Sequence, residues 1–284
     1  MRFRSWINIA LLIAVAIVAT AMFLLRDAGR LEPQALTELD PATVTQVEVD
    51  YHDDRPAMRL RGDGGNWQVV EPITRPARSA RMVRVLSFLN DRVDSCYADN
   101  EDRRAEFGVD QPGLTLAVDG VEIEFGDRTQ GGRRYVGIDE RLCVVDDVAY
   151  PLLSEGLSAI AVMSLLPSDS TPVSIRAPAV EAVDPDGDDS WEFETGEGAG
   201  QRWSVRWRST NAAGFELDPP DDDYGEVAIE LADGGSLRWR IAAEPGEEQA
   251  LILVPEGHDY GLLIEPADAA GLIRPPQLVE DGLT

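Results

Sequence analysis

The sequence contains no lysine, only two cysteines and only two histidines. Without lysine, a Schiff-base mechanism and a P-loop phosphate site are both excluded, because each needs that amine. All 25 basic residues are arginine and face 52 acidic residues, which gives a formal net charge of -27. A chain this acidic lacks the clustered cations that bind nucleic-acid phosphates, so nucleic acid is excluded as a partner.

A long apolar segment occurs near the N-terminus. Residues 7–25 are 19 consecutive positions with only two polar residues among them. A helix of that length spans roughly 28 Å, close to the hydrocarbon core of a bilayer. Arg2, Arg4 and Trp6 precede it, so we expect an uncleaved transmembrane helix with the N-terminus inside. The alternative is a signal peptide that is cleaved near residues 19–21.

The rest of the chain has the composition of a folded protein, with 44% hydrophobic residues overall. Short apolar runs alternate with glycine, proline and aspartate turns, which is typical of antiparallel sheets. We therefore predict an α+β fold, mostly antiparallel β, in which an N-terminal transmembrane helix is followed by two diverged β-rich repeat modules. The expected boundaries are an anchor over residues 1–30, a tether over 31–42, a first module over 43–165, a second, degenerate module over 166–275 and a tail over 276–284.

Two elements of the first module are well marked. Asp119-Gly120, flanked by alternating apolar residues, predicts a hairpin over residues 114–125. A helix is predicted over residues 77–92, because apolar residues recur there on one face at spacings of three and four. These residues are Met82, Leu86, Leu89 and Val93.

The second half echoes the first. Residues 196–205 resemble residues 62–69, and residues 227–241 resemble the predicted hairpin. The spacing from Trp203 to the second hairpin is 23 residues shorter than that from Trp67 to the first. We therefore expect the second module to lack the helix. The alternative is a coincidental similarity between two β-meanders.

The two cysteines, Cys96 and Cys143, both fall in the first module and beyond the apolar segment. An oxidising periplasm permits a disulfide between them, which would stabilise the fold by roughly 4 kcal/mol on the loop-entropy model. We predict that they lie in neighbouring strands and are bridged. Two separate buried thiols are the alternative.

Few residues suggest catalysis or metal binding. His52 and His258 each lie in a predicted turn, and no G-x-S-x-G motif accompanies them, so a serine hydrolase is not indicated. The motifs H-E-x-x-H and C-x-x-C are absent, which argues against zinc. We predict no enzymatic activity, no cofactor and no metal.

Two features keep ligand binding open as an alternative. The acidic run over residues 184–189 suggests a cation site, but it departs from a calcium-binding loop and is interpreted as a turn. Trp203, Trp207 and Trp239 could form a glycan-binding platform. Their alternation with Val205 and with Ile241 favours inward positions on strands.

One basic stretch stands out in this acidic chain. Residues 72–90 contain no acid, but arginines recur there at every third position; they are Arg75, Arg78, Arg81 and Arg84. On the predicted helix, the last three would form a stripe beside the apolar face. We interpret the four as a possible docking surface for an acidic partner or for anionic lipid. The alternative is that they pair with carboxylates of their own domain.

Several residues together carry a resemblance to a known family. They are Trp67, Pro72, Phe107-Gly108-Val109 and Pro112. With the anchor and the hairpin, they make the chain resemble the bacterial domain of unknown function 4340 (DUF4340), best over residues 43–165. The resemblance implies a membrane-anchored protein in the setting of gliding-type ABC transporter auxiliary components, and no known activity.

Taken with the anchor, this resemblance leads to one functional expectation. We expect a single-pass inner-membrane protein whose periplasmic C-terminal part binds or scaffolds within an envelope ABC-transporter-type complex. A module that binds a small ligand, a glycan or a cation is the alternative, and a hydrolase is less favoured.

The charge of the soluble part predicts a response to salt. Residues 31–284 carry 21 arginines and 51 acidic residues, a net charge of -30. Salt screens the repulsion between these charges, so we expect a halophilic protein whose folded state is stabilised by salt. The melting temperature of residues 33–284, followed by circular dichroism, should rise from low to molar NaCl. A melting temperature that stays flat or falls would contradict this.

Overall fold

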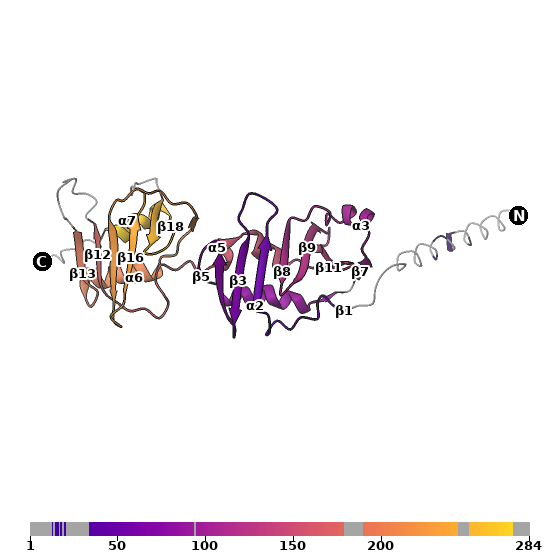
Figure 1. Ribbon diagram of the computed structural model, residues 1–284, viewed down its shortest axis with the longest axis horizontal. Coiled ribbons are helices and arrows are strands. Elements are labelled where there is room, and N and C mark those ends of the chain that lie inside the picture. The colour runs from indigo at the N-terminus through magenta and orange to yellow at the C-terminus, as the bar shows by residue number, and fades with distance from the viewer. Residues whose placement is uncertain are drawn as a thin grey trace, which may run out of the picture. The chain divides into compact units, whose positions relative to one another are not determined.

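The computed structural model describes residues 34–93, 95–178, 190–243 and 250–274, together with residues 13, 15, 16, 18 and 20. Its contacts divide the chain into two compact units. The first unit comprises Met1–Gly65 and Ser79–Ser154, and the second comprises Asn66–Arg78 and Glu155–Thr284. Strands predominate in both units and the helices are short (Figure 1). The fold is therefore α+β and mostly antiparallel β, as the sequence predicts.

The predicted anchor over residues 7–25 lies almost entirely outside the described residues. The five positions that are described there have helical conformation. Within the described part of the chain, no helix is long and apolar enough to cross a bilayer.

The first unit is built around an antiparallel sheet in which seven of its strands pair in sequence. They are β2 (Gln46–Asp50), β3 (Met58–Asp63), β7 (Ser95–Ala98), β8 (Leu114–Val118), β9 (Val121–Arg128), β10 (Arg133–Ile138) and β11 (Arg141–Asp146). Their order is β3-β2-β8-β9-β10-β11-β7. The other elements of the unit are β1 (Gln34–Ala35), α2 (Ser79–Ser87), the 3-10 helix η1 (Phe88–Asn90), β6 (Arg92–Val93), α3 (Glu101–Glu106) and α4 (Ala149–Ser154). Strands β1 and β6 form a separate pair.

Strands β2 and β8 bury every second residue. In β8 the buried positions are Leu114, Leu116 and Val118, and in β2 they are Val47 and Val49, all at most 1% exposed. This alternation sends one face of the sheet into the core and sends the residues between to the other face.

The predicted hairpin is confirmed by β8 and β9. Asp119 and Gly120 occupy the turn with φ of 45° and 89°, the left-handed region that a two-residue hairpin turn requires. The Asp119 carboxylate also accepts hydrogen bonds from the backbone N–H groups of Thr45 (3.2 Å) and Gln46 (2.9 Å). The turn is thereby fixed to the strand that pairs with β8.

The predicted helix over residues 77–92 is too long. Helix α2 ends at Ser87 and tightens into η1, and Val93 belongs to β6. The carbonyl of Leu89 accepts the N–H of Thr37, and that of Asp91 accepts the N–H of Leu36. These carbonyls bond to the chain around β1, so they are not used for a further helical turn.

The two cysteines join β11 and β7, the last two strands in the sheet of the first unit. Cys96 in β7 lies directly opposite Cys143 in β11. Their sulfurs form a disulfide, and their Cα atoms are 4.1 Å apart. Strand β7 is the terminal strand of the sheet and has only four residues. The disulfide therefore fixes a short edge strand to its neighbour.

The second unit is built around a seven-stranded antiparallel sheet in the order β13-β12-β15-β16-β17-β18-β14. Its strands are β12 (Pro172–Pro178), β13 (Ser190–Glu194), β14 (Gly214–Glu216), β15 (Glu226–Leu231), β16 (Ser236–Ile241), β17 (Leu251–Pro255) and β18 (Gly261–Ile264). The unit also contains β4 (Asn66–Glu71), β5 (Arg75–Pro76), α5 (Leu157–Ile160), α6 (Gly198–Ser209) and α7 (Pro266–Ile273). Strands β4 and β5 pair antiparallel with each other. Helix α6 packs against α7 and against β12 and β13 (Figure 1).

The two units share a succession of elements, which in the first half of the chain is interrupted by β4, β5, η1, β6 and α3. In each, a hairpin (β2–β3 or β12–β13) is followed by a helix (α2 or α6) and then by the strand of the far edge (β7 or β14). Four strands that pair consecutively come next, β8 to β11 or β15 to β18, and a short helix, α4 or α7, follows them.

The prediction that the second half lacks a helix is wrong, because α6 has 12 residues. Trp203 and Trp207 lie on this helix and not on strands. They are four positions apart, about one helical turn, and both are fully buried. Their indole N–H groups donate to the carbonyl of Leu272, at 2.9 and 3.1 Å. Val205 between them is 60% exposed, so a period of 3.6 and not 2 explains the pattern.

Part of the internal echo is also wrong. Residues 196–205 lead into and form part of α6, whereas residues 62–69 form the end of β3, a two-residue turn and the start of β4. Trp239, in contrast, lies on β16 as predicted and is 3% exposed. Trp203 and Trp207 are buried on α6 and only Trp239 of the three lines a pocket, so the three tryptophans do not form one platform.

A buried ion pair connects β10 to the segment before α4. The guanidinium of Arg134 donates to the Asp147 carboxylate at 2.8 Å, to the Gly126 carbonyl at 2.6 Å, and lies 3.5 Å from the centre of the Tyr150 ring. The side chains of Arg134 and Asp147 are only 11% and 6% exposed. Removal of the Asp147 charge would leave the buried guanidinium of Arg134 without its carboxylate partner.

We therefore predict that Asp147→Ala lowers the free energy of unfolding by about 3–5 kcal/mol. Its neighbour provides the matched control. Asp146 pairs with Arg133 at 3.1 Å, but its side chain is 71% exposed. Asp146→Ala should therefore cost less than about 1 kcal/mol. Urea unfolding followed by circular dichroism measures both, and equal losses would contradict the prediction.

The burial of Tyr51 leads us to predict a loss of stability at alkaline pH. Its side chain is 4% exposed, and the Arg55 guanidinium lies 4.1 Å from its ring centre. Burial raises the pKa of Tyr51 from 10 to about 12, with Arg55 acting in the opposite direction. The unfolded chain therefore ionises first as the pH rises. Between pH 10 and about 12 the stability should fall by roughly 2 kcal/mol. The free energy of unfolding of Tyr51→Phe should lack this part of the pH dependence. If the free energy of unfolding falls with pH at the same slope in the variant and in the unmodified chain, the prediction is wrong.

Candidate functional site

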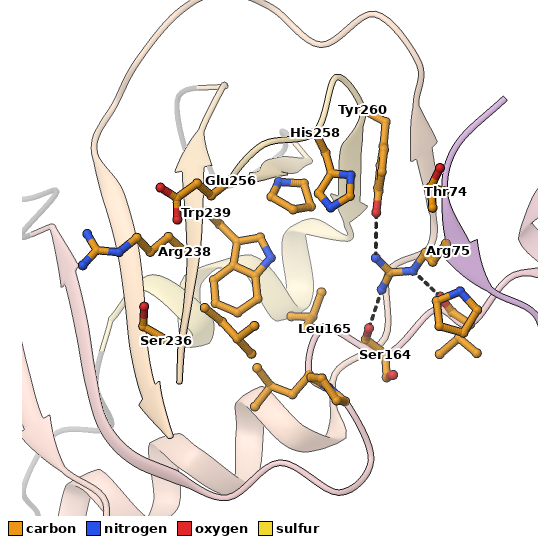
Figure 2. Close-up of a pocket in the computed structure, with 16 residues that line it drawn as sticks. Thr74, Arg75, Ser164, Leu165, Ser236, Arg238, Trp239, Glu256, His258 and Tyr260 are labelled. Atoms are coloured by element: carbon orange, nitrogen blue, oxygen red, sulfur yellow. Dashed lines mark hydrogen bonds between the residues drawn. The ribbon is translucent and has the colours of Figure 1, made fainter. Parts of the chain in front are cut away.

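The second unit contains a pocket of about 350 Å³ (Figure 2). Four stretches that are far apart in the sequence line it. They are residues 74–76, residues 162 and 164–167, residues 236–239, and residues 255, 256, 258 and 260. The lining combines apolar side chains with two arginines, one glutamate and one histidine, which is the usual mixture of a small-molecule site.

Backbone pairing builds the wall that carries Arg75. After the cis peptide bond between Glu71 and Pro72, the chain returns as β5, which pairs with β4. Beyond β5, Ala77 forms a bridge with Ala161. The N–H of Val162 donates to the carbonyl of Pro76 at 2.8 Å. This antiparallel contact brings residues 162–164 alongside the start of β5.

Arg75 is held by three neutral groups. Its Nε donates to the Val162 carbonyl at 2.6 Å, and its Nη2 donates to the Ser164 carbonyl, also at 2.6 Å. Its Nη1 donates to the hydroxyl of Tyr260 at 3.2 Å. The guanidinium also lies 5.9 Å from the centre of the Phe215 ring. The half-buried side chain is therefore fixed in position.

The opposite wall comes from β16, β17 and the turn that follows. Trp239 in β16 pairs with Pro255 in β17, and the Trp207 ring packs behind its indole at a centroid distance of 5.3 Å. In the turn, the exposed His258 packs its ring 5.1 Å from that of Tyr260. Figure 2 shows the Trp239 indole and the His258 imidazole on the same side of the pocket, facing Arg75.

The base of the pocket is apolar. Leu165 and Leu166 are 5% and 3% exposed. Their segment is held by a bridge between Ser164 and Asn211 and by a hydrogen bond of 2.8 Å from the Ala212 N–H to the Met163 carbonyl. This arrangement keeps the leucines in place below the polar groups.

The arrangement is suited to binding. Arg75 offers hydrogen-bond donors beside an aromatic and aliphatic surface. Arg238, at the rim, is held by Glu226 at 2.8 Å. None of the described pocket hydroxyls is hydrogen-bonded to His258, so the pocket holds no nucleophile–base pair of the serine hydrolase kind.

Among the described residues, no group of His, Cys, Asp and Glu could hold a metal ion. The acidic run over residues 184–189 lies outside the described residues.

The four arginines of the predicted docking surface do not share one element. Arg75 lies in β5, and Arg78 precedes α2 and is half-buried, with its N–H donating to the Ile160 carbonyl at 2.8 Å. Arg81 and Arg84 lie on α2, where Arg84 is exposed. The first two belong to the second unit and the last two to the first. Docking through Arg81 and Arg84 stays a prediction.

Sequence reasoning missed the pocket. It interpreted His258 as a solvated turn residue and gave Tyr260 no role, although both line the pocket with Arg75 and Trp239. The one usable signal was the absence of acidic residues around Arg75, which leaves that guanidinium without a local partner.

The Phe107-Gly108-Val109 segment, which carries part of the family resemblance, does not line the pocket and has a structural role. The Phe107 ring stacks on Tyr135 at 4.1 Å, with 4° between the planes. Gly108 has φ of 66°, which glycine adopts readily. A Cβ at Gly126 would collide with the Phe107 carbonyl oxygen. Arg104 bridges the segment to the sheet through Glu124 at 2.7 Å. The motif therefore closes α3 onto β9 and β10.

Comparisons with curated proteins and with solved structures found no match. A family described as a domain of unknown function (DUF4340) matches residues 67–233, which is more than half of the chain. The match begins at β4 and ends in the turn after β15, so it reaches further into the second unit than the expected residues 43–165. The chain therefore belongs to the DUF4340 family.

Proposed function

We propose that the protein is an inner-membrane protein with a single anchor over residues 7–25 and a periplasmic C-terminal part that binds other molecules. The observation that carries the proposal is the Cys96–Cys143 disulfide. Disulfides persist in oxidising compartments such as the periplasm and are rare in the cytosol. Both cysteines follow an apolar run of bilayer length, which supports an anchor that leaves them on the oxidising side.

Binding is proposed in preference to catalysis. The pocket places a fixed guanidinium beside an indole and two leucines, and none of the described pocket hydroxyls bonds to His258. Binding sites commonly combine an apolar lining with a few polar groups that fix the orientation of the ligand.

The matching succession of elements in the two units supports two diverged copies of one β-rich module. Each unit has a hairpin, a helix, a far-edge strand and four consecutively paired strands. Two modules in series on one anchor suit a scaffold. The resemblance to proteins found near gliding-type ABC transporter components gives the partner that we propose, a component of an envelope transport complex.

Two measurements test this proposal. Protease added to spheroplasts should digest residues 31–284, because the proposal places them outside the inner membrane. Crosslinking in native membranes should then capture a subunit of an ATP-driven transporter. If residues 31–284 are protected in spheroplasts but cleaved in inverted vesicles, the proposed topology is wrong. Capture of soluble cytosolic proteins alone would overturn the proposed partner.

The arginines of α2 offer a sharper test of docking. Arg81→Glu with Arg84→Glu should abolish the crosslink, because their charge would repel an acidic partner. Arg78 is left unchanged because it precedes α2 and belongs to the second unit. The matched control is Arg202→Glu with Arg208→Glu, two exposed arginines of α6. Loss of the crosslink with both pairs, or with neither, would contradict docking through α2. Circular dichroism checks that each variant is folded.

A further inference from the structure

Arg75 is a cation without an anion in a strongly acidic protein. Its hydrogen-bond acceptors are two carbonyls and one hydroxyl, all formally neutral. Within the described part of the chain, no carboxylate forms an ion pair with it. Arg238, which lines the same pocket, is by contrast paired with Glu226. In a chain with 52 acidic residues, the absence of a carboxylate at a half-buried guanidinium leaves that position available to an external anion.

The free donors of Arg75 face the pocket. A guanidinium has five N–H groups, and the three hydrogen bonds of Arg75 use one on each nitrogen. One N–H on Nη1 and one on Nη2 therefore remain. Figure 2 shows these two nitrogens on the side of Arg75 that faces His258, Trp239 and Leu165. A pair of parallel N–H groups is the geometry that binds a carboxylate through both of its oxygens.

The rest of the pocket suits an apolar body of limited size. Trp239 and Leu165 supply an aromatic and an aliphatic surface, each at most 5% exposed. A volume of about 350 Å³ is near the lower end of the range for small-molecule sites. Glu256 also lines the pocket and would repel a doubly charged phosphate. A singly charged acid fits these groups best.

We propose that this pocket binds a small organic acid, with its carboxylate on Nη1 and Nη2 of Arg75 and its apolar or aromatic body against Trp239 and Leu165. The inference goes beyond the proposed function and does not depend on the anchor or on the transporter partner. It gives the second unit a ligand of its own.

The test uses the full-length chain in detergent, with phenylacetate as the acidic probe and phenylacetamide as its neutral counterpart. The two histidines of the chain are the reporters, because His258 lines the pocket and His52 lies in the first unit. Phenylacetate should shift the imidazole NMR signals of His258 saturably, with a Kd of about 1 mM for a ligand this small, and should leave His52 unchanged. Phenylacetamide should bind at least about 10-fold more weakly, because it carries no charge to pair with Arg75.

Substitution identifies the responsible arginine. Arg75→Gln should weaken phenylacetate binding by about 10-fold or more and leave phenylacetamide binding nearly unchanged. The matched control is Arg238→Gln, which should retain the affinity within about 2-fold because that guanidinium already pairs with Glu226. If circular dichroism shows that Arg75→Gln is unfolded, the comparison of acid and amide on the unmodified chain decides alone. Equal affinities for acid and amide, parallel shifts of both histidines, or no saturable shift of His258 would overturn the proposal.

Discussion

A charged side chain that is buried in either unit needs a partner, and in this chain arginine is the only strong cation available. Arg134 holds Asp147 while it lies over the Tyr150 ring, and Arg104 holds both Asp99 and Glu124. Each of these contacts ties a loop or a short helix to the sheet. The planar guanidinium is suited to the task because it bonds in several directions and stacks on aromatic rings. The guanidinium of Arg75 also donates hydrogen bonds in several directions, but its acceptors are neutral oxygens, and the pocket opens beside it.

Local sequence patterns predicted those elements whose conformation is set by residues adjacent in the sequence. Asp119-Gly120 predicted its hairpin because the turn conformation is a property of those two residues. The helix pattern at Met82 located α2, but it overestimated the length, because the end is set by bonds from Leu36 and Thr37. Trp203 and Trp207 were assigned to a strand because two indoles four positions apart fit a period of 2 as well as one of 3.6. The 60% exposure of Val205 distinguishes the two, because a period of 2 would place Val205 on the same buried face as both indoles.

The pocket could not be predicted in the same way. Its walls meet through the bridges Ala77–Ala161 and Ser164–Asn211 and through the pairing of Trp239 with Pro255. None of these contacts follows from a periodicity, since each joins stretches from different elements of the second unit. The segment around Phe107 is recognisable in the sequence as a family motif, but in the structure it has a packing role. Motif residues and pocket residues are therefore different sets in this chain.

The disulfide has a consequence for association between copies of the chain. The outer edge of a terminal strand carries unpaired N–H and C=O groups to which a strand of another molecule can add. A four-residue strand held only by hydrogen bonds would detach easily and would then expose the longer β11 as a new edge. Because Cys96 and Cys143 are covalently joined, β7 cannot leave β11 while the bond is intact. The bond therefore protects the sheet against edge-to-edge aggregation, and a reducing environment would remove that protection.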